Sequence, residues 1–363
     1  MNIEQIKKIE LEITSDCNAA CPGCARTLNI DKLTLNSFTL DDLKRLFPNT
    51  FMITGKQFKF CGVLGDPAMN AECVDMVKYL VQNGAYCELS TNGGVQTAEW
   101  WARLGSIAAS KPGQVHVHFC LDGHKETNHI YRVNTKFNVI ERNMAAYSST
   151  APVHSATWIY IVFDHNEHEL AVAEAHAAQL GFHFATRTGM RNSYHTWLAQ
   201  LTKKENKIVV KETRAITTSG SKEHSKKAAV QELDKFIVEY KTNKVDNNKT
   251  QEILNSIVCK HIHEGEIFIA SNQTLWPCCF LWDSAFKNSE KIIEKLEIFE
   301  PNWNSLRHWS IEGILQHPWY KELLAASWQP DHPLHFSRCI RTCAKNKAYH
   351  NEINYKQPMV STV

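Results

Sequence analysis

Short apolar runs that each end in a polar string recur along the first half of the chain. Residues 9–13 alternate Ile or Leu with Glu10 and Glu12, which is the period-two pattern of a half-buried strand. Similar runs predict strands at 58–64, 86–89, 115–119 and 158–163, and a sixth at 182–186. The first of these strands leads directly into a cysteine-rich loop.

Segments with helical spacing separate the predicted strands. The clearest are Ala71–Asn83 and His168–Leu180, which are followed by Gly84 and Gly181, residues suited to end a helix. Strand, polar loop, helix and strand in repeated order indicate an α/β fold with a parallel sheet. The polar strings then follow the carboxyl ends of the strands, where chemistry sits in parallel barrels.

Composition excludes several classes of protein. The chain has 363 residues, 43% hydrophobic, and a formal net charge of only +2. This content supports a packed core, and the charge does not favour nucleic acid or an anionic membrane surface. No apolar run reaches the length of a signal peptide or of a membrane span. We therefore expect a soluble cytoplasmic protein, in which cysteines are metal ligands or buried thiols.

Three cysteines lie close together on the loop that follows the first strand. Cys17, Cys21 and Cys24 have the spacing Cys-x-x-x-Cys-x-x-Cys, and three thiolates on one loop can bind three irons of a four-iron cluster. The fourth iron then has no protein ligand and is open to a chelating molecule. The alternative is a zinc site completed by one of the 18 histidines.

This cysteine spacing resembles that of the radical S-adenosylmethionine (radical SAM) superfamily. The resemblance implies a partial (β/α)6 barrel, a [4Fe-4S] cluster with one open iron, and S-adenosylmethionine (SAM) bound at that iron. It also implies reductive cleavage of SAM to a 5′-deoxyadenosyl radical that abstracts hydrogen from a substrate. A flavodoxin- or ferredoxin-type protein is the expected electron donor.

Two strand-end strings match the family's SAM-binding positions. Gly65, Asp66 and Pro67 stand where the family carries its GGEP-like motif, and Asp66 would accept hydrogen bonds from the amino group of SAM. At the end of the third strand lie Ser90, Thr91, Asn92 and Gly93, of which Thr91 or Asn92 would contact the ribose. Each string alone is also an ordinary turn sequence.

The chain departs from the family pattern in two places. Gly23 replaces the common aromatic residue before the third cysteine, and Cys120 replaces serine in the string Cys120-Leu-Asp122-Gly. Cys120 is either a hydrogen-atom donor to a substrate radical or a small buried side chain. By the resemblance Asp122 belongs to the cofactor site and Arg132 pairs with the SAM carboxylate, although Arg132 also suits a helix surface.

A second group of cysteines lies in the last third of the chain. It comprises Cys259, Cys278, Cys279, Cys339 and Cys343, and a hairpin is predicted between the first two. The arrangement resembles a SPASM/twitch domain with one auxiliary [4Fe-4S] cluster, held by Cys259, Cys278, Cys339 and Cys343. Gln273 stands where that family has glycine. Zinc is the alternative metal, and Cys61, Cys73, Cys87, Cys120 and Cys279 are left without a ligand role.

These expectations divide the chain into a radical SAM barrel (1–195), a lysine-rich helical connector (196–255), an auxiliary-cluster domain (256–350) and a tail (351–363). A basic RNA-binding arm is the alternative for the connector, but aromatic residues are sparse there. The expected substrate is a peptide or protein side chain. One alternative is a small alcohol or amine, oxidised with the auxiliary cluster as electron acceptor, and another is a non-catalytic metal-binding scaffold.

Overall fold

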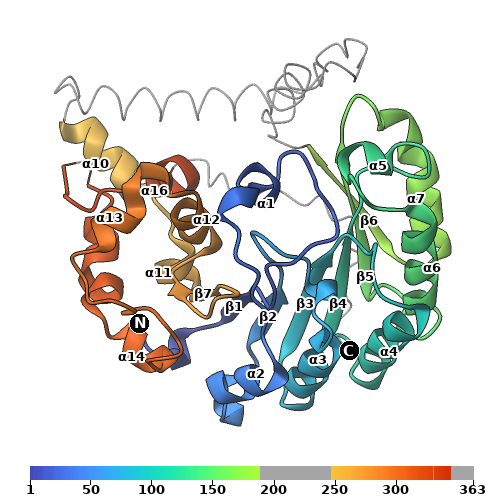
Figure 1. Ribbon diagram of the computed structural model, residues 1–363, viewed down its shortest axis with the longest axis horizontal. Helices are drawn as coiled ribbons and strands as arrows, with labels where there is room; N and C mark the ends of the chain where they lie inside the picture. The colour runs from blue at the N-terminus through green and yellow to red at the C-terminus, as the bar shows by residue number, and fades with distance from the viewer. Residues whose placement is uncertain (189–246, 330, 345–363) are drawn as a thin grey trace. The chain divides into compact units, whose positions relative to one another are not determined.

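The computed structural model describes residues 1–188, 247–329 and 331–344 (Figure 1). These residues form two compact units that are each discontinuous in sequence. The first unit combines Met1–Glu12 and Asp41–Phe58 with residues 247–344, and the second combines Ile13–Leu40 with residues 59–188. The expected connector lies outside the described residues as far as position 246, and the expected tail lies wholly outside them.

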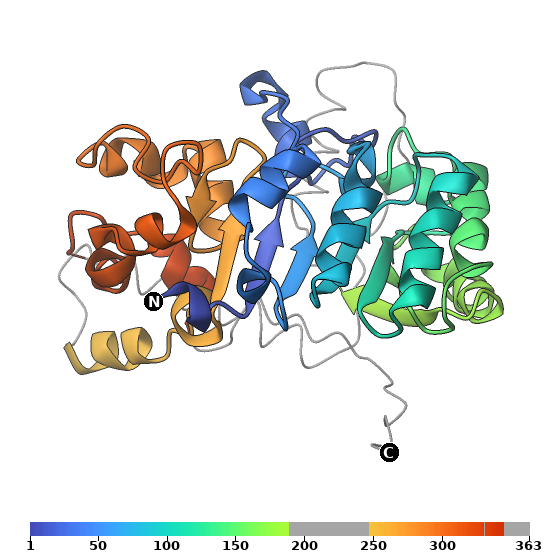
Figure 2. The same ribbon diagram turned by 90° about the horizontal axis from the view of Figure 1, so that it is seen from below.

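The second unit is a parallel sheet with helices along one face. Its strands are β3 (Tyr86–Thr91), β4 (Val115–Cys120), β5 (Ala156–Val162) and β6 (His183–Thr188), and each pairs in parallel with the next. The main helices are α3 (Cys73–Gln82), α4 (Ala98–Ser110), α6 (Phe137–Ser148) and α7 (Leu170–Gln179). Both views show these helices alongside the strands (Figures 1 and 2). The predicted strands and helices are therefore confirmed here.

Shorter elements of the second unit surround the loops at the strand ends. They are α1 (Ala25–Leu28), η2 (Ile30–Lys32), η4 (Pro67–Met69), α5 (Asn128–Tyr131) and η5 (Glu167–Glu169). As predicted, Gly84 and Gly181 follow the ends of α3 and α7, with left-handed φ angles of 84° and 70°. Glycine adopts this conformation without the steric cost that a Cβ would add.

The helix-facing side of this sheet is the core of the second unit. Phe119 on β4 packs against the fully buried Trp101 of α4 and Tyr147 of α6, with ring centroids 5.3 and 6.1 Å apart. Successive strand residues point to opposite faces, so His118 and Cys120 point away from these helices. Because Phe119 faces the helices, its neighbours His118 and Cys120 lie on the opposite face of the sheet.

The first unit contains the C-terminal cysteines. Its strands are β1 (Lys8–Leu11), β7 (Glu266–Ile269) and β8 (Leu275–Trp276), with β1 parallel to β7 and β7 antiparallel to β8. This confirms the predicted hairpin. Its helical elements are η1 (Ile3–Gln5), α2 (Leu40–Leu46), η3 (Thr50–Met52), α10 (Asn247–Asn255), α11 (Lys260–Glu264), α12 (Cys279–Lys287), η6 (Ser289–Lys291), α13 (Ile292–Leu296), α14 (Ile311–Leu315), η7 (Trp319–Leu323), α15 (Leu324–Ala326) and α16 (Ser337–Cys343).

Strand β2 (Gln57–Phe60) includes residues of both units. The order of neighbouring strands is β6–β5–β4–β3–β2–β1–β7–β8, which makes a mostly parallel sheet of eight strands. The predicted α/β class is confirmed, and a partial barrel is consistent with this order.

Strand β1 differs from its prediction in one respect. The alternating pattern predicts one solvated face, but Glu10 and Glu12 are each only 1% exposed. The carboxylate of Glu12 accepts hydrogen bonds from the backbone N–H and the hydroxyl of Ser271, at 3.2 and 2.9 Å. The prediction of a half-buried strand is therefore wrong, and at Glu12 a polar partner distant in sequence satisfies the carboxylate inside the unit.

Within the described part of the chain, no helix is both long enough and apolar enough to cross a membrane.

Candidate functional site

The loop with the first three cysteines belongs to the second unit. Backbone hydrogen bonds hold its middle and its end, from Ala20 N–H to the Val133 carbonyl (3.0 Å) and from Cys24 N–H to the Cys21 carbonyl (3.1 Å). All three cysteines belong to one small apolar cluster built around Ala19 and Tyr131. The structure thus brings the three predicted ligands together on one loop.

Hydrogen-bond donors approach two of these thiols. The Asn92 side-chain amide lies 3.8 Å from Sγ of Cys17, and the Arg132 guanidinium lies 3.8 Å from Sγ of Cys21. Burial, with a smaller contribution from the Asp66 carboxylate, raises the pKa of Cys17 to about 12. A buried thiolate therefore needs a positive partner, and donors that point at sulfur suit thiolates bound to iron.

Gly65 is required by a close approach of two backbone segments. A Cβ at this position would lie 1.8 Å from the carbonyl oxygen of Thr14. The neighbouring Asp66 N–H donates to the carbonyl of Asp16 at 2.8 Å. Gly65 therefore lets the Gly-Asp-Pro string lie directly against the start of the cysteine loop.

The Asp66 carboxylate is buried and accepts four hydrogen bonds. Oδ1 accepts from the Thr91 hydroxyl (2.8 Å) and the Ala68 N–H (3.0 Å), and Oδ2 accepts from the backbone and side-chain amides of Asn92 (2.7 Å each). Burial raises the pKa of Asp66, while these donors oppose the rise. Asp66 thus joins the Gly-Asp-Pro string to the end of β3.

Thr91 and Asn92 lie at that strand end as predicted, and both are buried. Ser90 is half-buried on β3. The Asn92 side-chain amide also donates to Oδ1 of Asn18 at 2.9 Å, and its oxygen accepts from Gly94 N–H at 2.8 Å. Sequence reasoning missed Asn18. Its position directly after Cys17 was the signal that could have found it.

Arg132 and Asp122 form a buried ion pair. The Arg132 Nε lies 2.7 Å from Oδ2 of Asp122, whose side chain is fully buried. Burial lowers the pKa of Arg132, but the Asp122 carboxylate reverses the effect and raises it. The same guanidinium lies near Cys21, so Arg132 faces the cysteine loop and does not lie on a helix surface as the alternative had it.

Cys120 is the last residue of β4, and its thiol lies 3.7 Å from the His118 carbonyl. Burial raises the pKa of Cys120, and the nearby guanidinium groups of Arg132 and Arg187 oppose the rise. A thiol in this environment remains protonated at neutral pH.

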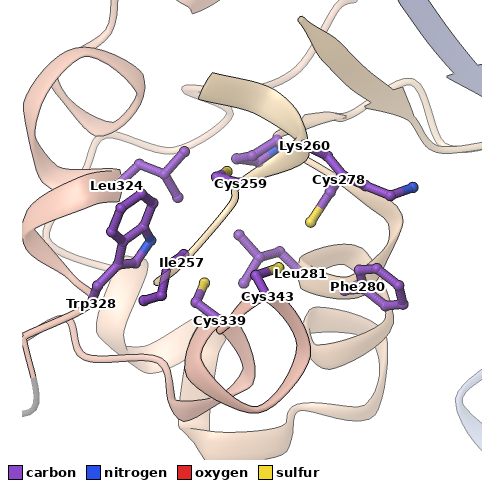
Figure 3. Close-up of a pocket in the computed structure, with 11 residues that line it drawn as sticks. Ile257, Cys259, Lys260, Cys278, Phe280, Leu281, Leu324, Trp328, Cys339 and Cys343 are labelled. Atoms are coloured by element: carbon purple, nitrogen blue, oxygen red, sulfur yellow. The ribbon is translucent and has the colours of Figure 1, made fainter. Parts of the chain in front are cut away.

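The second group of cysteines lines a cavity in the first unit (Figure 3). Cys259 and Cys278 precede α11 and α12, and Cys339 and Cys343 lie one turn apart on α16. The remaining wall is mostly apolar and is formed by Ile257, Pro277, Phe280, Leu281, Leu324 and Trp328, together with Lys260. Cys279 is not among the residues that line this cavity.

The cavity suits thiolate ligands that are shielded from water. Burial raises the pKa of Cys278 to about 12 and also raises that of Cys259. Backbone N–H groups at the starts of α12 and α11 oppose these shifts. Amide donors near sulfur in an apolar wall stabilise thiolates that bind a metal.

Gln273 adopts the left-handed conformation that the family's glycine would supply, with φ of 64°. Its side-chain oxygen accepts from Arg45 at 2.6 Å, and its side-chain nitrogen donates to Asp42 at 3.0 Å. These hydrogen bonds offset the free-energy cost of a left-handed backbone at a residue with a Cβ.

Among the described residues, no group of three or more His, Cys, Asp or Glu side chains is positioned to hold a single metal ion. Thiolates of a four-iron cluster each bind a different iron, so their sulfurs lie further apart than the ligands of one ion.

No family model matches the chain. The PqqA peptide cyclase of Bradyrhizobium diazoefficiens is 30% identical over 116 residues, which are 32% of this chain and 28% of that protein. The AdoMet-dependent heme synthase of Nitratidesulfovibrio vulgaris is 31% identical over 99 residues, which are 27% of this chain and 26% of that protein. The matched parts thus span less than a third of each curated relative.

Among solved structures, Streptococcus suis SuiB bound to S-adenosylmethionine is similar with a TM-score of 0.48 and 10% identity. The similarity covers 82% of this chain and 66% of that chain. Each of the two sequence matches is to part of an enzyme.

Proposed function

We propose that the chain is a radical SAM enzyme whose first cluster is held by Cys17, Cys21 and Cys24. The convergence of these three thiols with the Asn92 side-chain amide at the end of β3 and with Arg132 at the end of α5 carries this proposal. When bound, a reduced four-iron cluster supplies the electron that cleaves SAM to a 5′-deoxyadenosyl radical. The protein supplies the positions of cofactor and substrate.

The residues around the cysteine loop have separate roles in this proposal. Asn92 and Arg132 donate toward the sulfurs of Cys17 and Cys21 and stabilise them as thiolates. Asp66 holds the end of β3 against the loop through its four hydrogen bonds. We propose that Gly65, Ser90 and Thr91 belong to the SAM site, since they lie at or next to these strand ends.

We assign Asp122 to positioning Arg132, because the two form a buried ion pair. Arg132 remains the proposed cation for the SAM carboxylate, through guanidinium nitrogens other than the one that pairs with Asp122. Cys120 lies close enough to Arg132 and Asp122 for their charges to act on it, and it is the proposed hydrogen-atom donor.

We propose an auxiliary [4Fe-4S] cluster on Cys259, Cys278, Cys339 and Cys343, since these four line one cavity and Cys279 does not. Replacement of each by Ser should lower the iron content of reconstituted protein, and Cys279→Ser is the matched control. Zinc in place of iron at this site would refute the cluster.

The proposed substrate is a peptide or protein side chain, by analogy with the peptide cyclase that the chain resembles. A flavodoxin- or ferredoxin-type protein is the proposed electron donor. Because the clusters and their donor require reduced thiolates, we propose a cytoplasmic location.

The test is anaerobic reconstitution with iron and sulfide, addition of SAM and dithionite, and quantification of 5′-deoxyadenosine by mass spectrometry. The Cys17/Cys21/Cys24 triple Ala variant should form none, and Cys61→Ala should form it normally. Absence of both SAM binding and 5′-deoxyadenosine, in protein with a verified cluster, would favour a metal-binding scaffold instead. A small alcohol or amine that stimulates formation and is itself oxidised would redirect the substrate assignment.

A further inference from the structure

A buried lysine shares the cavity with the four C-terminal cysteines. Lys260 directly follows Cys259, and its side chain is 12% exposed. Its ammonium group donates to Oε1 of Glu266 at 2.9 Å. Glu266 is 2% exposed and is not among the residues that line the cavity. Lys260 therefore belongs to the wall around the thiols, and its partner Glu266 does not.

The ring of Phe280 connects this lysine to a second cation. Nζ of Lys260 lies 5.6 Å from the ring centroid, and Cζ of Arg338 lies 5.4 Å from it. Figure 3 shows Phe280 on the side of the cavity where Cys278 and Leu281 lie. The two cations thus flank one aromatic wall of the cavity.

The Lys260 side chain lies in the same wall as the thiols. Lys260 lines one cavity with Cys259, Cys278, Cys339 and Cys343, and the other residues of that wall are apolar. Arg338 is 37% exposed and Lys260 only 12%, so solvent screens the charge of Arg338 more. Lys260 is the better shielded of the two cations.

We propose that Lys260 sets the reduction potential of the cluster held by Cys259, Cys278, Cys339 and Cys343. This inference rests on the proposed auxiliary cluster. Reduction adds one electron to the cluster from an external donor and changes no covalent bond. A fixed cation in an apolar wall stabilises the more negative, reduced form, so Lys260 makes the cluster easier to reduce. The site then suits acceptance of an electron and is more than a structural brace.

The test isolates the auxiliary cluster in the full-length Cys17/Cys21/Cys24 triple Ala variant. Iron and sulfide content are measured first, and the potential is then determined by a redox titration followed by electron paramagnetic resonance. In this background, Lys260→Met should lower the ratio of reduced to oxidised cluster at a given potential by tenfold or more. For one electron that is about 59 mV toward more negative values.

Three further variants separate charge from packing. Lys260→Arg keeps the charge and should keep the potential, and Lys44→Met, at a 47% exposed lysine of α2, should leave it unchanged. Among the described residues Glu266 pairs with Lys260 and with Lys8, and Lys260→Met leaves the pair with Lys8 at 3.6 Å. Lys260→Met/Glu266→Gln is therefore compared with Glu266→Gln alone and should show the same negative shift.

The outcomes distinguish the two proposals. Failure of the triple Ala background to bind iron and sulfide refutes the auxiliary cluster itself. A normal cluster whose potential is the same in the Lys260→Met and Lys44→Met variants overturns the role of Lys260 alone. Equal shifts for Lys260→Met and Lys260→Arg would also overturn it, since packing and not charge would then be responsible.

Discussion

Replacement of Asp66 by Asn tests whether this carboxylate joins the Gly-Asp-Pro string to β3. Oδ1 of the amide can still accept from Thr91 and Ala68, but its NH₂ group would face the two Asn92 donors that now lie 2.7 Å from Oδ2. The Asn92 side-chain oxygen already accepts from Gly94, so a simple flip of that amide does not restore the network.

The size of the effect follows from the two lost bonds. Hydrogen bonds to charged groups contribute about 1.5–3 kcal/mol each, so the loss is roughly 3–6 kcal/mol. A buried amide costs less to desolvate than a carboxylate, which favours the lower end, about 3 kcal/mol. That corresponds to a local opening equilibrium raised by roughly 100-fold.

Hydrogen exchange with mass spectrometry measures this opening at the amide of Asn92. The Asp66→Asn variant is compared with its matched control, Asp75→Asn, at equal iron content. Asp75 is 38% exposed and pairs with Arg103 on the surface of the same unit, where such pairs contribute about 0–1 kcal/mol. Protection of Asn92 in Asp66→Asn equal to that in Asp75→Asn would refute the structural role of the carboxylate.

Three other perturbations have definite expected outcomes. Arg132→Met leaves Asp122 buried and unpaired and should destabilise the protein by roughly 3–5 kcal/mol in urea unfolding, with much of the loss recovered in Arg132→Met/Asp122→Asn; no recovery would contradict the ion pair. Gln273→Ala and Gln273→Gly both lose the side-chain hydrogen bonds, but only Ala has a Cβ at the left-handed φ, so it should be the less stable by about 1 kcal/mol. The reverse order would contradict the backbone cost. Burial, with the charge of a neighbouring histidine, lowers the pKa of His116 from 6.5 to about 4. The neutral side chain therefore contributes to stability above pH 6.5. The protein should lose roughly 3 kcal/mol of this stability as the pH falls from 6.5 toward 4. Unfolding of His116→Gln between pH 7 and 4 should show a correspondingly smaller loss, and an unchanged pH dependence would refute the assignment.

The strands and the strand-end loops could be predicted because their signals are local. Apolar runs at 115–119 and 158–163 are long enough to indicate buried strands, and the structure has β4 and β5 there. The position of Asn92 at the end of β3 follows from the same pattern. Its contact with Cys17 follows only from the fold.

Long-range partners could not be predicted from the same signals. Glu10 and Glu12 look solvated by alternation, and only the tertiary structure brings Ser271 to Glu12. Arg132 shows no sign in the sequence of its pairing with Asp122. Polar groups become buried where distant segments supply hydrogen bonds, and a periodic pattern carries no information on which segments those are.

The pairing of β1 with β7 has a consequence for synthesis of the chain. Lys8 lies opposite Glu266, so the N-terminal strand gains this neighbour only after most of the protein has been translated. At about 5–20 residues per second, that strand waits on the ribosome for roughly tens of seconds with one edge unpaired. Contacts between segments so far apart in sequence slow folding. Folding of the unit that contains Cys259, Cys278, Cys339 and Cys343 therefore waits until both strands have been synthesised.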